Sequence, residues 1–382
     1  MRIKAGKIII LFALFFISGC GMTNVEQTAV GSGLGVDLDG QGKILFYAQF
    51  NRPVNIQEAG ISEIQAEVFV GTGLTPTQAA RDIILTLPRL PLWSHADVFV
   101  VGETLARTDL SYMADFLARN RNIRKDALIV LAHQATPYDI FQSDFPMSLS
   151  SRGLVDLLEI QEEMYGVYKP VSCDEFLNKA ASPGIDPIMP QVTVSQQEDR
   201  PVITLDGMAV FRQNRLVGSL NELESRGYLW LTATKKLGGL IVLDNPLPGL
   251  NFVTLEVSRF NSCTYPRIEG GEITMDIEVE AILNLHDQGG LADVQKLENI
   301  ETLETLASRE IERQVRACIN GAQQLNGDIL GWGKKVYSYY PQVWTTIENN
   351  WYEIFPHVRA QVTVQTEIRK QGQLNAPLTL RR

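Results

Sequence analysis

The segment EITMDIEVEAILNLH, residues 272–286, alternates apolar and polar side chains along most of its length. The apolar side chains that share one side of this extended chain are Ile273, Met275, Ile277, Val279 and Ala281. A period of two is typical of a β-strand that buries one face and leaves the other in water. Sheets with one wet face are usually antiparallel, so the segment favours an antiparallel sheet.

A long helix is predicted after this strand, from about Ala292 to Leu325. The apolar stripe of its later part is formed by Ile311, Val315, Cys318 and Ala322. Spacings of four, three and four residues place these side chains on one side of a helix. We expect this stripe to pack against the apolar face of the strand. The sequence NPLPG at 245–249 marks the start of the C-terminal unit, because proline and glycine break regular elements.

Upstream of residue 245, short apolar strands alternate with helices, which favours a mixed α/β arrangement. The segments 97–101 and 127–132 are apolar almost throughout and are predicted to be buried strands. The length of 382 residues predicts two or three domains.

The N-terminus has the features of an export signal. Three basic residues, Arg2, Lys4 and Lys7, precede an apolar run over residues 8–17. A helix needs about 20 apolar residues to cross a bilayer, so this run is a signal-peptide core rather than a membrane span.

The apolar run ends in Ile17-Ser18-Gly19-Cys20, an aliphatic residue, two small residues and a cysteine. This is the pattern of a bacterial lipobox. We predict cleavage before Cys20 and attachment of diacylglycerol to its sulfur, so that residues 1–19 are a lipoprotein signal peptide and 20–27 a lipidated tether. An ordinary signal peptide with a cysteine by chance is the alternative.

The remaining chain is acidic. Removal of the leader, which has three positive and no negative side chains, changes the formal net charge from −10 to about −13. Such a surface gains no electrostatic attraction from DNA, RNA or anionic lipid, so no nucleic-acid partner is expected. Attachment to a membrane would then depend on the acyl chains at Cys20.

The cysteines and histidines show no metal-site spacing. Cys173, Cys263 and Cys318 form no CxxC pair. The four histidines, which are scattered singly, are His95, His133, His286 and His357. We therefore predict neither a zinc site nor a cofactor. Cys318 fits the apolar stripe as a buried free thiol, and a Cys173–Cys263 disulfide is left open, because exported proteins can form disulfides.

Two segments resemble catalytic or cofactor motifs only superficially. Residues 31–35, GSGLG, continue into a turn and not into a helix, so they cannot direct a helix N-terminus at a phosphate. Ser94, His95 and Asp97 lie too close together in sequence to adopt the geometry of a catalytic triad. We predict that the chain is not an enzyme.

Two further segments are candidates for protein contacts. The loop NRNIRKD, residues 120–126, carries Arg121, Arg124 and Lys125, which are either a solvated surface or a contact for an acidic patch on a partner. The aromatic-rich stretch 328–355 is either a folded cap over the long helix, which we favour, or an exposed binding face.

The order and spacing of several motifs resemble the Ger(x)C family, the C-subunit lipoproteins of bacterial spore germinant receptors. The segments that carry the resemblance are LPR at 87–89, WSHADV at 93–98, VGETLAR at 101–107, DFLARN at 115–120, DGMAVF at 206–211, LVG at 216–218 and DILGWG at 328–333, followed by Pro341, Trp344, Trp351 and Phe355. Many members have Cys-Trp-Asp after the lipobox, whereas Cys20 here precedes Gly21 and Met22.

The resemblance implies an α+β fold of three mixed α/β domains, with largely antiparallel sheets, packed helices and the long helix in the C-terminal domain. We place an N-terminal domain at 28–196, a middle hairpin-helix unit at 197–245 and a C-terminal domain at 250–375.

The resemblance also implies a lipoprotein without catalysis on the outer face of the spore inner membrane. Its partners would be the A and B membrane subunits of a nutrient receptor. The alternative from the sequence is a substrate-binding lipoprotein of a transporter, which would have two lobes built on parallel sheets.

Overall fold

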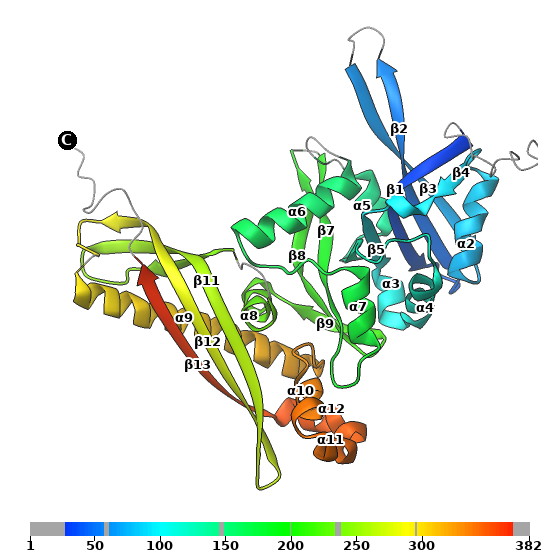
Figure 1. The fold of residues 1–382 in the computed structure, drawn as a ribbon. Helices are drawn as coiled ribbons and strands as arrows, with labels where there is room; N and C mark the ends of the chain where they lie inside the picture. Colours follow the sequence, from blue (N-terminus) through cyan, green and yellow to red (C-terminus); the bar gives the residue numbers. More distant parts are fainter. Residues whose placement is uncertain are drawn as a thin grey trace, which may run out of the picture.

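The computed structural model describes residues 27–56, 61–143, 145, 149–198, 200–233, 238–294 and 296–369. These residues form two β-sheets and a set of packed helices (Figure 1). The predicted mixed α/β fold, with a long helix in the C-terminal part, is confirmed.

The larger sheet has the order β3-β2-β1-β5-β6-β7-β8-β9, and β4 pairs with β1 outside this path. Its strands are β1 (Thr28–Leu38), β2 (Ile44–Ile56), β3 (Ile61–Gly73), β4 (Leu90–Leu92), β5 (Val98–Gly102), β6 (Leu128–Ala132), β7 (Ile188–Gln197), β8 (Arg200–Arg212) and β9 (Arg215–Leu220). The central pairs β1–β5, β5–β6 and β6–β7 are parallel. The pairs at the two ends of the sheet, β3–β2 and β2–β1 on one side and β7–β8 and β8–β9 on the other, are antiparallel.

The smaller sheet has the order β10-β11-β12-β13. Its strands are β10 (Leu240–Asp244), β11 (Leu250–Glu269), β12 (Glu272–Gly290) and β13 (Arg359–Arg369). The three strands β10, β11 and β12 are antiparallel, and β13 joins β12 in parallel. The predicted antiparallel strand at 272–286 is therefore confirmed as part of β12.

The helices before the smaller sheet are α2 (Pro76–Asp82), η2 (Ile83–Leu85), η3 (Trp93–His95), α3 (Glu103–Thr108), α4 (Ser111–Arg119), α5 (Pro137–Gln142), α6 (Ser150–Met164), α7 (Cys173–Ala180) and α8 (Glu222–Thr232). Those that follow β12 are α9 (Leu297–Leu325), α10 (Trp332–Tyr339), α11 (Pro341–Ile347), η4 (Glu348–Asn350), α12 (Trp351–Ile354) and η5 (Phe355–His357). The long helix starts at Leu297, five residues later than predicted.

The larger sheet is covered on both faces. Alternate residues of β5 enter two different cores: Phe99 packs with side chains of α3, α4 and α7, whereas Val100 packs with those of α5 and α6. Every residue of β5 is buried. A strand buried on both faces reads as a continuous apolar run, which explains why 97–101 lacks alternation.

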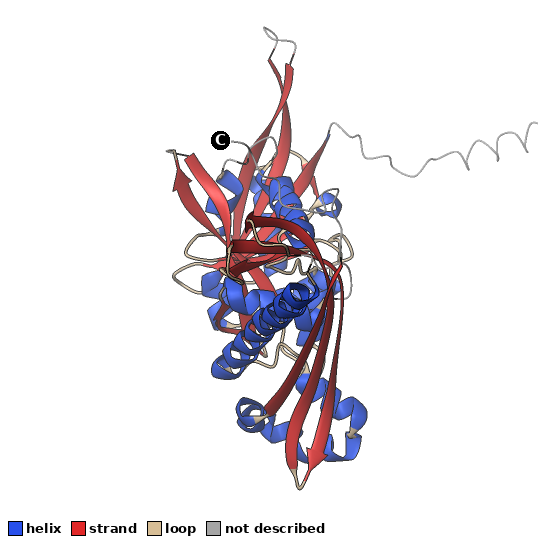
Figure 2. Cartoon of the chain, turned by 90° about the vertical axis from the view of Figure 1, so that its left-hand side faces the viewer, coloured by secondary structure: helices blue, strands red, loops and turns tan. Residues whose placement is uncertain are grey.

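The smaller sheet is covered on one face by α9. The predicted stripe of α9, including Ile311, Val315 and Cys318, is fully buried in the same core as Met275 and Ile277 of β12. The opposite face of the sheet carries polar residues, for example the cross-strand row Asn261, Glu280 and Gln365. Figure 2 shows the long hairpin β11–β12 reaching beyond the helices at the bottom of the molecule.

Helix α8 connects the two sheets. It packs tightly on α9, because a Cβ atom at Gly227 would lie only 2.0 Å from the carbonyl oxygen of Gln314. The indole of Trp230 donates a hydrogen bond to Oε1 of the same Gln314 at 2.8 Å. Strands β8 and β9, predicted within the unit 197–245, pair into the larger sheet. The boundaries of the three domains stay a prediction.

Candidate functional site

The basic loop at 120–126 connects α4 to β6 and is held in place by buried Ile123. Arg121 is exposed and forms no ion pair with any residue that the structure describes. Lys125 is half-buried, and its Nζ lies 3.5 Å from the carbonyl oxygen of Asn120. Arg121 is thus the loop cation best placed to meet a partner.

Arg124 is engaged within the chain. Its guanidinium contacts Oδ2 of Asp126 at 2.6 Å and Oδ1 of Asp97 at 3.0 Å. The hydrogen bond to Asp126 raises the pKa of Arg124 and, reciprocally, lowers the pKa of Asp126. Because two carboxylates offset its charge, Arg124 adds less positive potential to the loop than the sequence implies.

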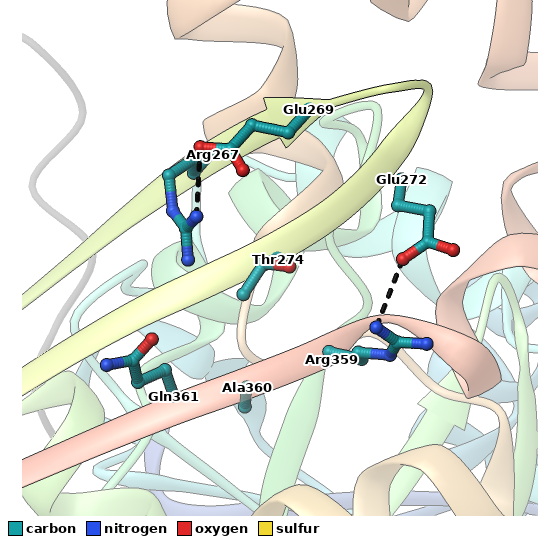
Figure 3. Close-up of a pocket in the computed structure, with 7 residues that line it drawn as sticks. All are labelled: Arg267, Glu269, Glu272, Thr274, Arg359, Ala360 and Gln361. Carbon is teal, nitrogen blue, oxygen red and sulfur yellow. Dashed lines mark hydrogen bonds and ion pairs between the residues drawn. The ribbon is translucent and has the colours of Figure 1, made fainter.

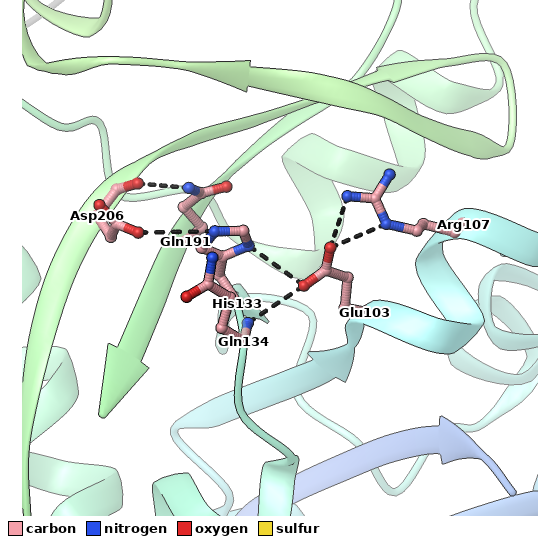
Figure 4. A network of polar contacts seen from close by, with 6 residues as sticks. All are labelled: Glu103, Arg107, His133, Gln134, Gln191 and Asp206. Atoms are coloured by element: carbon pink, nitrogen blue, oxygen red, sulfur yellow. Dashed lines mark hydrogen bonds and ion pairs between the residues drawn. The ribbon is translucent and has the colours of Figure 1, made fainter. Parts of the chain in front are cut away.

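A polar network lies at the carboxyl ends of β5 and β6 (Figure 4). Glu103 follows β5 directly, and His133 follows β6. Nδ1 of His133 lies 3.2 Å from Oε2 of Glu103, and Nε2 lies 3.8 Å from Oδ2 of Asp206 in β8. The histidine therefore stands between carboxylates from two separate parts of the chain.

Glu103 is the most connected member of this network. Its carboxylate accepts hydrogen bonds from the Gln134 backbone N–H at 3.1 Å and from the Arg107 guanidinium at 2.6 and 2.8 Å. Partial burial acts to raise the pKa of Glu103, but these hydrogen bonds outweigh it and lower the pKa. The ionised Glu103 carboxylate connects the carboxyl end of β5 to the residues that follow β6, so its role is structural.

A second polar joint is buried where the two halves of the chain meet. The Asp186 carboxylate, just before β7, accepts a hydrogen bond from the Asp328 backbone N–H at 2.7 Å and from the Tyr352 hydroxyl at 2.9 Å. The Asp186 backbone N–H donates to the Asp328 carbonyl oxygen at 2.8 Å. The two aspartates thus connect the segment before β7 to the segment after α9.

Asp328 is fully buried and caps the start of α10. Its carboxylate accepts hydrogen bonds from the backbone N–H groups of Trp332 at 2.9 Å and Gly333 at 2.8 Å, and from the Trp351 indole at 3.0 Å. Burial raises the pKa of Asp328 to about 7, in spite of these hydrogen bonds, and nearby Asp186 adds to the rise. Burial likewise raises the pKa of Asp186.

The glycines of the DILGWG segment allow this joint to close. Gly331 has a φ of +67°, in the left-handed region that favours glycine. A Cβ atom at Gly333 would lie 2.8 Å from the Cα of Gly184, so two backbone segments are in direct contact. The Lys334 N–H donates to the Gly184 carbonyl oxygen at 2.7 Å.

The aromatic residues after α9 form the cap that we favoured from the sequence. Trp332, Trp344, Trp351 and Phe355 are buried, and the Trp344 and Trp351 rings meet edge to face at 5.4 Å between centroids. Tyrosines of α10 remain exposed. The stretch is therefore mainly core.

A hollow of about 410 Å³ lies beside the tip of the β11–β12 hairpin (Figure 3). It is lined by Arg267, Glu269, Glu272, Thr274, Arg359, Ala360 and Gln361. Its charged groups pair with one another: Arg267 with Glu269 at 3.0 Å, and Arg359 with Glu272 at 3.1 Å. Because these charges are already matched, the hollow is a weak candidate for an ionic ligand.

The residues that superficially resembled a triad do not form one. Asp97 pairs with Arg124 and, at 3.9 Å, with Arg152, whereas His95 is exposed on η3. Within the described part of the chain, no three His, Cys, Asp or Glu side chains are placed to hold a metal ion.

The disulfide left open by the sequence is not formed. Cys173, Cys263 and Cys318 are all free, and Cys173 and Cys318 are buried. Burial raises the pKa of the Cys173 thiol to about 12 and also raises the pKa of Cys318. Both thiols are core residues, because Cys173 begins α7 against the sheet and Cys318 lies in the α9 stripe.

Two family profiles match nearly the whole chain. Residues 21–194 match the profile described as spore germination protein N-terminal domain, and residues 206–372 match spore germination B3/GerAC like, C-terminal. The chain belongs to the GerAC family of spore germination proteins, the C-subunit family of germinant receptors. The resemblance drawn from the sequence motifs is thus confirmed.

Two curated relatives are similar in sequence, and one solved structure shares the fold. Spore germination protein YndF of Bacillus subtilis (strain 168) is 22% identical over 353 residues, which cover 91% of this chain and 81% of the relative. Putative spore germination protein YfkR of the same organism is 20% identical over 308 residues, 79% of this chain and 78% of the relative. The crystal structure of the GerBC protein shares the fold, with a TM-score of 0.58, 18% identity, and coverage of 88% of this chain and 96% of that one.

The two polar contacts between distant segments join the two family regions. Asp186 and His133 lie in the region matched by the N-terminal profile, and their partners Asp328 and Asp206 lie in the C-terminal region. Asp328 and Asp206 each begin a segment that carried the resemblance in the sequence. The structure thus gives these segments a physical role in holding the regions together.

The predicted lipidation site is outside the described residues, as are the predicted signal peptide and all of the tether before Gln27. Among the helices that the structure describes, none combines the length and the apolar character needed to cross a membrane.

Sequence reasoning missed the roles of His133, Glu103 and Asp186. A usable signal existed for the first two, because each directly follows a short buried strand, and the carboxyl ends of neighbouring parallel strands meet at one edge. Asp186 lay in a proline-rich connection, and nothing in the sequence pointed to its partner 142 residues away.

Proposed function

We propose that this chain is the lipid-anchored C subunit of a spore nutrient-germinant receptor and acts by docking to the A and B membrane subunits. The observation that carries the proposal is membership of the germination family over both regions of the chain, together with a lipobox that ends at Cys20. The subunit would lie on the outer face of the spore inner membrane and perform no turnover of its own.

The anchor is tested by metabolic labelling with a fatty acid. Wild-type chain should be labelled and should sediment with membranes, whereas Cys20→Ala should lose both the label and the membrane fraction. Cys263→Ser is a matched control, because Cys263 is half-exposed and free but lies outside the lipobox. Label retained by Cys20→Ala would contradict the anchor.

The docking surface that we propose includes the loop cations Arg121, Arg124 and Lys125. Three basic side chains on an acidic protein can steer association with an acidic patch on a partner. Exposed Arg121, which forms no ion pair with a described residue, makes the best single test, since Arg124 is paired with Asp97 and Asp126. Reversal of all three charges should weaken co-purification with the A and B subunits and slow nutrient-triggered germination.

A single charge reversal in the loop, Arg121→Glu, can be compared with a single charge reversal elsewhere, Arg200→Glu. Both arginines are exposed and neither forms an ion pair with a described residue, but Arg200 lies at the start of β8. Arg121→Glu should reduce co-purification while the melting temperature stays within about 1 °C of wild type, as is usual for surface substitutions. Equal effects of the two variants would remove the loop from the interface. Normal germination in a strain that lacks the whole chain and any paralogue would overturn the receptor role.

A further inference from the structure

An apolar patch stands at the place where the described chain begins. Its members are Val30, Ile84, Leu85 and Leu90, which are all more than one third exposed, Leu85 at 83%. Exposed apolar side chains that gather at one end of a fold commonly mark a contact with a protein or a membrane. We call these four residues the apolar patch.

The patch is close to the first strand. Strand β4 pairs in parallel with the start of β1, so that Leu90 lies opposite Thr28 and Leu92 opposite Val30. Neighbouring strands are about 4.8 Å apart, so Leu90 lies within one strand spacing of the N-terminal end of the fold. Only four residues separate Leu90 from Leu85.

The direction of α2 carries Ile84 and Leu85 towards the same end of the sheet. A Cβ atom at Gly73 would meet Gln78 and Ala79, and one at Gly71 would meet Ala79 and, further along the helix, Ile83. Helix α2 therefore runs antiparallel to β3 and carries η2 back towards the start of β1, in agreement with Figure 1, where β4 lies beside the upper end of α2. Leu74, which is 78% exposed, is at the other end of α2.

The length of chain before β1 limits how far this surface can lie from the proposed anchor. Cys20 and Thr28 are eight residues apart, and an extended chain spans at most about 3.6 Å per residue, or roughly 29 Å. An anchor at Cys20 would thus keep the start of β1, opposite Leu90, within about 30 Å of the bilayer surface. Arg89, beside Leu90, is exposed and forms no ion pair with a described residue, so it is free to reach lipid headgroups.

We propose that the apolar patch inserts into the interfacial layer of the membrane and orients the anchored subunit on it. The inference rests on the proposed anchor at Cys20, because the tether supplies the proximity. Apolar side chains that enter the headgroup boundary, flanked by a basic residue, are the chemistry of peripheral membrane binding. A weak contact of this kind is sufficient, since the lipid already holds the chain at the surface.

The test replaces the lipid by a tag, so that it does not depend on lipidation. The chain from residue 21 onward carries a hexahistidine tag in place of Cys20 and binds vesicles of phosphatidylethanolamine, phosphatidylglycerol and a nickel-chelating lipid. Cys263→Ser is present throughout, and a single Leu85→Cys or Leu74→Cys is labelled with the polarity-sensitive dye NBD. The two leucines are similarly exposed, so Leu74 is the matched control.

On these vesicles, NBD at Leu85→Cys should shift its emission to the blue and be quenched by brominated lipid, whereas NBD at Leu74→Cys should do neither. Leu85→Glu should weaken vesicle binding at low nickel-lipid density about tenfold, and Leu74→Glu should not change it. Absence of quenching at Leu85→Cys, or equal quenching at both positions, would overturn the proposal and leave the patch to a protein partner. Failure of the anchor itself would be seen separately, as absent fatty-acid labelling of Cys20.

Discussion

The two sheets of this chain bury their strands in different ways. The larger sheet lies between helices on both faces, and each residue of β5 is buried. The smaller sheet packs one face on α9 and leaves the other, with Glu278 and Glu280 of β12, in water. A side chain on that open face can change without disturbing a core, whereas the larger sheet has no such freedom in its central strands.

The difference also explains the sequence patterns. A strand with helices on both faces has no polar positions and loses its alternation, while β12 alternates because every second residue is solvated. Substitutions on the open face are therefore expected to cost little stability, and those in the larger sheet are expected to cost most.

The largest effect is expected for β5, where neighbouring residues enter different cores. Phe99→Ala should lower the free energy of unfolding by about 3–5 kcal/mol and Val100→Ala by about 2 kcal/mol, because each leaves a cavity on its own face. Chemical denaturation of both variants measures this. A negligible loss for either residue would show that one face of the sheet is not tightly packed.

A slightly smaller effect is expected in α9, which covers only one face of its sheet. Ile311→Ala should cost about 2–5 kcal/mol, because Ile311 is fully buried against the smaller sheet. The neighbouring Glu312→Ala, which removes a surface ion pair with Arg316, should cost no more than about 0.5 kcal/mol. Similar losses for the two variants would contradict a helix with one buried stripe.

The contact between the sheets can be tested at Gly227. Gly227→Ala adds a methyl group 2.0 Å from the Gln314 carbonyl oxygen, so α8 and α9 must separate. We expect a loss of about 1–3 kcal/mol, although alanine favours a helix more than glycine does. The control is Gly40→Ala, whose Cβ would meet nothing within 4 Å. A more stable Gly227→Ala would mean that the two helices are not in close contact.

A different kind of effect, a pH dependence rather than a loss of packing, is expected at the buried joint. The pKa of Asp328 is raised to about 7 in the folded state, from an ordinary value of 3.8, so the folded chain binds this proton more tightly. Its contribution to stability is complete below about pH 4 and is lost as the pH rises through about 7. Asp328→Asn cannot titrate, so the stability of wild type relative to this variant should fall between about pH 4 and pH 7. Denaturation at several pH values measures the difference, and a constant difference would refute the raised pKa.

The sequence was sufficient for features that depend on local patterns. In these features the order of apolar and polar residues shows which face of an element meets water. They are the alternation at 272–286, the α9 stripe around Ile311 and the buried strands at 97–101 and 127–132, and all were found as predicted. The family resemblance could also be recognised from the sequence, because its motifs follow one another in order.

Features that depend on pairing between distant segments could not be predicted. Nothing local connects Asp186 to Asp328, or His133 to Asp206, because such contacts arise only after the sheets have assembled. The charge of the 120–126 loop was overestimated in part for the same reason, since Asp97, one of the two carboxylates that offset Arg124, lies 27 residues away. The start of α9 was misplaced because the short mixed segment before Leu297, which contains Ala292 and Val294, does not distinguish a helix from a turn.

The joint between Asp186 and Asp328 limits how such proteins can be recombined. Consider a chimera that takes residues up to about 194 from one relative and the rest from another. Asp186 and Asp328 would then come from different proteins, and so would the two backbone segments that meet at Gly184 and Gly333. The two family regions are therefore not interchangeable parts. Exchange between receptors is expected to succeed only when the segments that contain Asp186 and Asp328 come from the same protein.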